Sequence, residues 1–369
     1  MYTTFKTFLG LLALSVLVSC GTDPFKSSQS IPSAFGDINQ LVVVQDPGFL
    51  ETETFDSLDY FFAGPYLILP QPEPLFDLKY FETPQVLRDA IVRQYRSYVI
   101  PAVLSDEDSP TTQMVREYLG EEKLRTVAEA GGGKTLVNRN RWADGQTIYF
   151  LVGETADDLL DLFRSDAPGI IDQLKREQVE RHRATAFAVQ GENMNVRRAL
   201  ANDFKIDLTI PASFQLVIAD TTNSFVWLRQ DIKEQPSLNI GPYVNSLTVR
   251  KVPYESQDQL TADYAKQLLN ETGRDYVQST VEGSYKQLDD GNLPIIVQPT
   301  TIDNNFALEL RGIWEMENDA MAGPFVAYLI HNPADGELLL AEGFIFAPNE
   351  DKRDYMEQLD MLLRGIRFL

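Results

Sequence analysis

In the segment 309–315 (ELRGIWE), the charged residues stand at alternate positions, at 309, 311 and 315, between Leu310, Gly312 and Trp314. If this segment is a strand, Glu309, Arg311 and Glu315 point to the same face of a sheet, because successive side chains of a strand point to opposite faces. An arginine between two carboxylates then has two interpretations. It contributes to a binding cleft, or it belongs to an ion-pair ladder on the solvent side of the sheet.

Six residues from this part of the chain are our candidate ligand-binding residues, and we predict no catalytic residue. The six are Glu282, Tyr285, Arg311, Trp314, Glu315 and Tyr328. Along one strand, Glu309 and Glu315 are about 20 Å apart, which is too far for two carboxylates acting on one glycosidic bond. Glu282 and Glu315 stay open as an acid–base pair, aided by Arg311.

Motifs for other kinds of chemistry are incomplete. The chain has two histidines, His182 and His331, which excludes a histidine-rich metal site and limits any Ser-His-Asp triad to these residues. We expect His182 to be solvated on a helix face. The run Gly-Gly-Gly-Lys-Thr at 131–135 lacks the first glycine of a P-loop, since Ala128 stands at that position, so we expect a hairpin loop. We predict no metal and no cofactor.

The N-terminal residues are typical of a bacterial lipoprotein signal. Residues 1–19 combine a positive charge at Lys6, an apolar run over 8–18 and small residues before Cys20, the only cysteine of the chain. The run is shorter than the roughly 20 apolar residues that cross a bilayer. We predict that the Cys20 thiol carries the lipid and that residues 20–32 form a flexible tether. A lipidated Cys20 excludes thiol catalysis and thiolate metal sites.

The charge of the chain restricts its partners. The formal net charge is −22, whereas nucleic-acid binders neutralise phosphates with lysine and arginine. We therefore predict no nucleic-acid partner and a membrane contact through the N-terminal lipid alone. By analogy with lipoprotein sorting, the absence of an aspartate directly after Cys20 favours the outer membrane, facing the periplasm. The expected partner is an envelope protein or glycan.

The elements that position these residues predict an α+β fold of two lobes, each with a mixed or antiparallel sheet and packed helices. We expect a first lobe over 33–190, a connecting helix within 191–206 and a second lobe over 207–369. The predicted strands span 38–45, 75–81, 98–103, 125–130, 147–152, 214–219, 225–229, 246–252, 294–297, 306–314, 325–330 and 338–346. The predicted helices span 52–62, 84–94, 111–119, 156–188 with a kink or break at Pro168, 196–204, 257–272 and 351–366.

Seven blocks of sequence carry a resemblance to a known family. They are INQLVVV (38–44), LPQPEPLFDL (69–78), FVWLR (225–229), EGSY (282–285), ELRGIWEMEND (309–319), AGPFVAYL (322–329) and GFIFAPNEDKRDY (343–355). The chain resembles an uncharacterised family of Bacteroidetes lipoproteins, a domain of unknown function. The resemblance implies an envelope lipoprotein and assigns no functional residue.

Three functions are compatible with these observations. The leading hypothesis is a non-enzymatic, lipid-anchored binding or interaction module. The second is a hydrolase or transferase that acts on cell-wall or glycan material through Glu282 and Glu315. The third is a carrier of a small ligand, with a pocket between the lobes lined by Trp314 and Tyr328.

Overall fold

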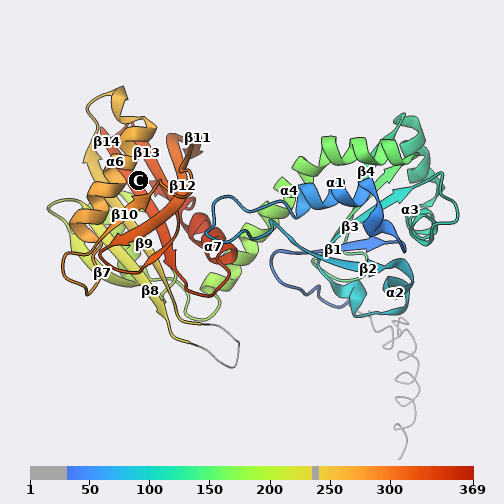
Figure 1. The fold of residues 1–369 in the computed structure, drawn as a ribbon, viewed down its shortest axis with the longest axis horizontal. Coiled ribbons are helices and arrows are strands. Elements are labelled where there is room, and N and C mark those ends of the chain that lie inside the picture. Colours follow the sequence, from blue (N-terminus) through green and yellow to red (C-terminus); the bar gives the residue numbers. More distant parts are fainter. Residues whose placement is uncertain (1–30, 235–240) are drawn as a thin grey trace, which may run out of the picture.

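The computed structural model describes residues 31–234 and 241–369. The predicted signal peptide, Cys20 and most of the predicted tether lie outside the described residues. The described chain forms two lobes, each built on one large sheet with helices packed against it (Figure 1). The prediction of a two-lobed α+β fold is therefore confirmed.

The first lobe contains a five-stranded sheet with the strand order β2-β1-β3-β5-β4. Its strands are β1 (Gln40–Gln45), β2 (Asp77–Glu82), β3 (Ser97–Val103), β4 (Gly133–Arg139) and β5 (Thr147–Gly153). All neighbours pair in parallel except β4 and β5. The central strands are buried over most of their length and apolar in their middle residues, because helices cover both faces of the sheet.

Two pairs of helices cover this sheet. On one face, α1 (Glu53–Phe62) and α4 (Ala156–Phe187) pack against Leu41, Val43 and Val99. On the other face, α2 (Thr83–Arg88) and α3 (Pro110–Glu129) pack against a second set of strand residues, which includes Val42, Tyr98 and Phe150. Short 3-10 helices occur at Phe49–Glu51, Val92–Gln94 and Gln257–Gln259.

The strand predicted over 125–130 is wrong, because these residues continue α3. Gly120 has a φ of 73°, so α3 consists of two helical segments that meet at a kink. After the kink, Leu124 and Val127 return to the core at helical spacing. At 131–135, where a hairpin loop is expected, only Gly131 and Gly132 lie in a turn, and residues 133–135 begin β4, which was not predicted as a strand.

The second lobe contains an antiparallel sheet with the order β10-β12-β13-β14-β9-β8-β7, in which β11 also pairs with β12. Its strands are β7 (Gln215–Asp220), β8 (Phe225–Ile232), β9 (Tyr243–Pro253), β10 (Tyr285–Asp289), β11 (Ile296–Ile302), β12 (Asn305–Glu317), β13 (Ala322–Asn332) and β14 (Glu337–Phe346). Helix α6 (Ala262–Tyr276) covers one face, and α7 (Arg353–Leu363) covers the other.

A smaller layer completes the second lobe on the α7 side. It comprises α5 (Met194–Ala199), a π-helical turn at Leu200–Phe204, and the paired short strands β6 (Ile206–Asp207) and β15 (Arg367–Phe368). Leu200, Phe204 and Ile206 enter the same apolar cluster as α7.

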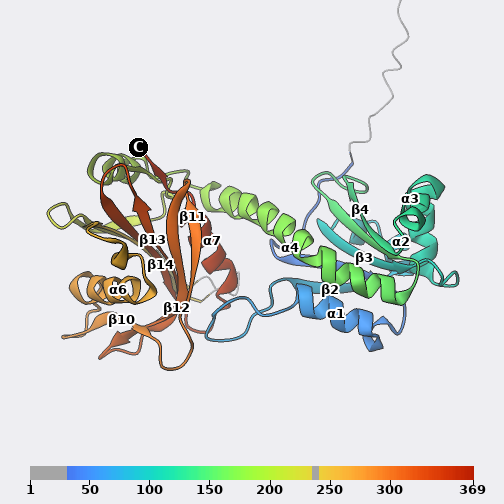
Figure 2. The same cartoon turned by 90° about the horizontal axis from the view of Figure 1, so that it is seen from above.

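Helix α4 connects the lobes. It begins at a capping box between Thr155 and Asp158. It continues through Pro168 without being split there, and its second half reaches α7 in the other lobe (Figure 2). Within residues 31–234 and 241–369, no helix has both the length and the apolar character needed to cross a membrane.

Candidate functional site

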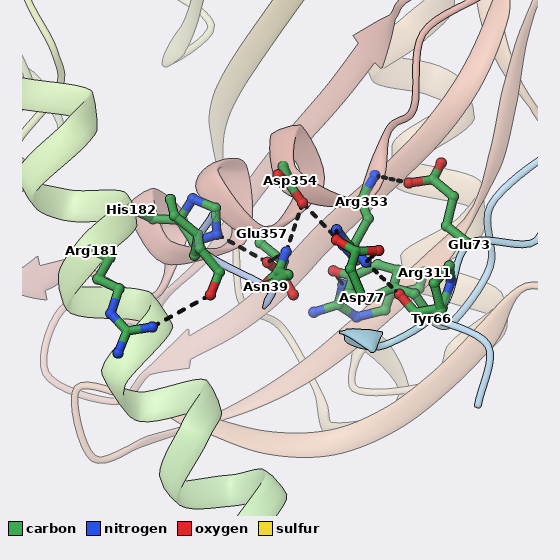
Figure 3. A network of polar contacts seen from close by, with 12 residues as sticks. Asn39, Tyr66, Glu73, Asp77, Arg181, His182, Arg311, Arg353, Asp354 and Glu357 are labelled. Carbon is green, nitrogen blue, oxygen red and sulfur yellow. Dashed lines mark hydrogen bonds and ion pairs between the residues drawn. The ribbon is translucent and has the colours of Figure 1, made fainter. Parts of the chain in front are cut away.

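The two lobes meet where the loop 64–74 and α4 approach the start of α7 (Figure 3). Glu73 of the loop accepts hydrogen bonds from the backbone N–H groups of Lys352 and Arg353, at 2.7 and 2.8 Å. These N–H groups lie at the N-terminus of α7, where a helix has no internal acceptors for them. The first lobe therefore supplies the cap of a helix in the second lobe.

A second group of contacts joins α4 to α7 through buried polar side chains. His182 on α4 lies 2.9 Å from Glu357 on α7, measured from Nε2 to Oε2. Asn39, which is fully buried before β1, donates to Glu357 and to Asp354 at 2.9 and 2.6 Å. The prediction that His182 is solvated is wrong, because 4% of the residue is exposed.

Next to these contacts, four side chains form a closed ring of alternating charge. Arg311 donates to Glu309 at 2.5 Å and to Asp360 at 2.6 Å. Arg364 donates to the second oxygen of Glu309 at 2.6 Å and to the other oxygen of Asp360 at 3.1 Å. Strand β12 supplies one carboxylate and one guanidinium, α7 supplies the carboxylate of Asp360, and Arg364 is the residue that caps the end of α7. Each arginine bridges both carboxylates, so the ring carries no net charge.

Two tyrosine hydroxyls extend the ring. Tyr328 on β13 donates to Asp360, and Tyr66 of the first lobe accepts from Arg311 at 3.2 Å. Burial raises the pKa of Tyr328 well above its ordinary value, so its hydroxyl remains a donor at neutral pH. Burial would also raise the pKa of Asp360, but Arg311, Arg364 and the hydrogen bond from Tyr328 outweigh it and lower that pKa.

A pocket of about 800 Å³ opens above this ring, between the lobes. The loop of the first lobe contributes apolar side chains to the lining, and α4 contributes a row of residues between Asp172 and Arg183. The floor is the ring itself, with Glu309, Arg311, Asp360 and Arg364 all lining the pocket. The apolar lining residues include Pro65, Leu67, Leu75, Val179 and Met361.

The structure brings together few of the residues predicted from sequence. Arg311 lines the pocket, and Tyr328 lies beneath it through its bond to Asp360. Trp314 is 1% exposed and packs in the apolar cluster on the α6 side of the sheet. The solvent-side ladder is wrong for Glu309 and Arg311, whose side chains are 4% and 11% exposed beneath α7.

The remaining three predicted residues lie outside this pocket. Glu315 accepts a hydrogen bond from Gln287 at 3.0 Å. Tyr285 begins β10, where Arg274 lies over its ring. Glu282 is exposed in the loop before β10. None of the three lines the pocket at Arg311.

Sequence reasoning missed Asp360, Arg364 and the pocket residues of α4. Asp360 and Arg364 stand four residues apart on a helix, a spacing at which side chains of opposite charge meet. That spacing predicts an ion pair between Asp360 and Arg364, but it does not show that both residues also pair with side chains of β12. In the described part of the chain, no group of three or more His, Cys, Asp or Glu side chains is arranged to hold a metal ion.

The fold and the site define a two-lobed α+β protein with a charged pocket between its lobes. Residues 193–365 match a family model described as a domain of unknown function (DUF4837), and residues 34–186 match a second one (DUF8532). These matches confirm the prediction of an uncharacterised family. No curated protein matches the chain in sequence.

Solved structures give distant likenesses. One is LpqN, described as involved in cell envelope biogenesis of Mycobacterium tuberculosis, with 13% identity over 44% of this chain and 81% of that chain, at a TM-score of 0.28. Another is the Ran-binding protein Mog1p of Saccharomyces cerevisiae, with 12% identity over 44% of this chain and 90% of that chain, also at 0.28. TM-scores this low do not carry a comparison of function.

Proposed function

We propose that the protein is a lipid-anchored, non-enzymatic binding module of the cell envelope, and that the pocket between its lobes is the binding site. The observation that supports a binding site between the lobes is the pocket itself. Its volume of about 800 Å³ falls within the range of roughly 300–1,000 Å³ that is typical of sites for small ligands. A small molecule, or the end of a glycan or peptide chain, has a suitable size.

The contacts around the pocket support this role, because they hold its walls in place. Glu73 and Asp77 attach the loop side to Arg353, and His182 attaches α4 to Glu357. A site whose walls are already fixed loses less freedom when the ligand binds.

We do not retain the hydrolase alternative, because its two carboxylates lie outside the pocket. Glu282 is exposed in a loop, and Glu315 is engaged by Gln287. Neither residue lines the pocket. The small-ligand carrier remains a second candidate, since it uses the same pocket, although Trp314 lies on the opposite side of the sheet.

The binding role is tested with a variant that fills the pocket. Val179 lines the pocket from α4, so Val179→Trp should block it, whereas Val189→Trp places the same ring at a position that is 90% exposed. The full-length proteins are incubated with a small-molecule and glycan extract of the envelope, and retained compounds are identified by mass spectrometry. Compounds held by the wild type and Val189→Trp but not by Val179→Trp support the proposal. Equal retention by all three proteins contradicts it.

The lipid anchor is tested separately. Mass spectrometry of the native N-terminal peptide should show acylation at Cys20, and Cys20→Ser should move the protein from the membrane to the soluble fraction. An unmodified Cys20 in the native protein contradicts this part of the proposal.

A further inference from the structure

A row of cationic side chains lies along the pocket wall formed by α4. Lys175, Arg176 and Arg183 all line the pocket and are exposed. Lys175, Val179 and Arg183 are spaced by four residues, which places them on one face of the helix. Arg176 adjoins this face and donates to Gln173 at 2.8 Å.

These three cations lack ion-pair partners, unlike the two arginines of the pocket floor. Among the residues that the structure describes, none of the three forms a salt bridge. The arginines of the floor, Arg311 and Arg364, are both neutralised within the ring.

The acidic groups that line the pocket do not cancel this charge. Glu309 and Asp360 are neutralised in the ring. Glu357, which accepts a hydrogen bond from Asn39 and lies 2.9 Å from His182, and Asp172 on α4 remain as two carboxylates beside three cations. In a chain with a formal net charge of −22, a wall with three unpaired cations is a local reversal of sign. Such a reversal in a concave site attracts anions.

We propose that this pocket binds a small anionic ligand with carboxylate or phosphate groups, and that Lys175, Arg176 and Arg183 are its charge contacts. This inference rests on the proposed binding role of the pocket. The apolar lining residues complete the description of the ligand. Leu67, which is 53% exposed, Leu75 and Met361 all line the pocket. The ligand therefore has an apolar or ring-shaped portion that contacts these side chains.

The ligand class is tested by calorimetric titration of the lipidated full-length protein in a non-ionic detergent. The probes are a disaccharide of galacturonic acid, pyrophosphate, the neutral disaccharide cellobiose and a disaccharide of glucosamine. The galacturonate and pyrophosphate arms distinguish a carboxylate ligand from a phosphate ligand. We expect saturable binding of at least one anionic probe, about tenfold tighter than binding of either non-anionic sugar. Weaker binding in 0.5 M salt is also expected, because salt screens exposed charges.

The location of the charge contacts is tested with two triple variants of equal charge. Lys175→Gln/Arg176→Gln/Arg183→Gln should weaken anion binding about tenfold, since each lost contact involves a partly solvated charge. Arg88→Gln/Arg125→Gln/Arg164→Gln removes three exposed cations outside the pocket and should leave binding within about twofold of the wild type. Equal weakening by both variants overturns the inference, because the effect would then come from net charge.

The outcomes separate the inference from the proposed function. If cellobiose binds as tightly as the anions, and Val179→Trp abolishes this binding, the pocket is a binding site but the anionic ligand class is wrong. If anions bind and Val179→Trp leaves their affinity unchanged, the pocket is not their site and the inference is overturned, whereas the binding role of the pocket is decided by the retention of envelope compounds. If neither anionic probe binds, the inference is overturned, and retention of envelope compounds still tests the binding role on its own.

Discussion

Arg353 at the start of α7 forms a two-bond ion pair with Asp77 at the start of β2. Nη1 lies 3.1 Å from one carboxylate oxygen and Nη2 lies 2.7 Å from the other. The same guanidinium donates to the carbonyl oxygen of Pro74 at 2.7 Å. Paired bonds of this kind fix direction as well as distance. Arg353, whose side chain is 7% exposed, is therefore one of the contacts that fix the orientation of the two lobes.

Removal of Glu73 should destabilise this junction. Glu73→Ala leaves the backbone N–H groups of Lys352 and Arg353 without their acceptor, and the loss of a helix cap costs about 1–2 kcal/mol. Glu73→Gln keeps one carbonyl oxygen and should lose roughly half as much. The measurement is the free energy of unfolding in urea at pH 7. Glu180→Ala, at an exposed position on α4, serves as the control. Equal stabilities of Glu73→Ala and the control would show that the cap is not important.

Asp360→Asn tests the ring of alternating charge. The amide has the same shape and still accepts from Tyr328, but it removes the negative charge that faces Arg311 and Arg364. Breaking a buried ion pair by neutralising one member costs about 3 kcal/mol. Urea unfolding at pH 7 should show a loss of this size, whereas Asp351→Asn, at an exposed position before α7, should show little change.

The same variant gives a pH dependence of known sign. The pKa of Asp360 is lower in the folded protein than in the unfolded chain. In the unfolded chain, an aspartate has a pKa of about 3.9. Its contribution to stability is therefore present above the unfolded pKa and is lost as the pH falls through the folded pKa. The stability difference between wild type and Asp360→Asn should stay constant from pH 7 to about pH 5 and shrink below about pH 4. A difference that persists unchanged at pH 3 would contradict the role of the carboxylate charge.

Local patterns were sufficient to predict most of the second lobe. Strands β12, β13 and β14 follow each other through short connections, and their apolar runs are long, so neighbours in sequence are also neighbours in the sheet. The prediction failed at 125–130, where threonine and valine favour a strand in isolation. There, Val127 lies on the second segment of α3, and its packing in the apolar cluster against the sheet overrides this preference.

Most residues of the candidate site could not be predicted from the sequence, because their partners lie far away in the chain. Arg311 was found from the alternation along its own strand. Its partner Asp360 is 49 residues away in sequence, and Tyr66 is 245 residues away. Tertiary packing alone brings such residues together. The pocket-lining cations on α4 could not be predicted either. On a helix of 32 residues, the sequence does not show which face the second lobe covers.

Gly323 should not tolerate a side chain. A Cβ at this position would lie 2.0 Å from the carbonyl oxygen of Ile345, the same oxygen that accepts a hydrogen bond from the indole N–H of Trp314 at 3.2 Å. Gly323→Ala must therefore separate β13 from β14 or break the bond to Trp314, at a cost of roughly 1–3 kcal/mol. Thermal unfolding should show the loss, and the emission of Trp314 should change. Gly336→Ala, in open space at a turn with a φ of 67°, is a control for backbone strain without a clash.

The ion pair between Lys286 and Glu342 offers a test of how charge is tolerated in the core of the second lobe. The ammonium lies 2.6 Å from the carboxylate, and the two side chains are 0% and 2% exposed. The rings of Phe325 and Phe344 flank the ammonium, with centroids at 5.7 and 5.1 Å. Lys286→Met leaves an unpaired buried carboxylate and should cost about 3–5 kcal/mol.

Replacement of both partners should restore most of this loss. In Lys286→Met/Glu342→Leu no charge is left in the core, and such apolar replacements are neutral or stabilising when the volume is similar. A double-mutant cycle based on urea unfolding measures the coupling between the two sites. We expect the double variant to be more stable than either single variant. If the two single losses simply add, the pair contributes no coupling, and the stability of this core comes from its apolar contacts alone.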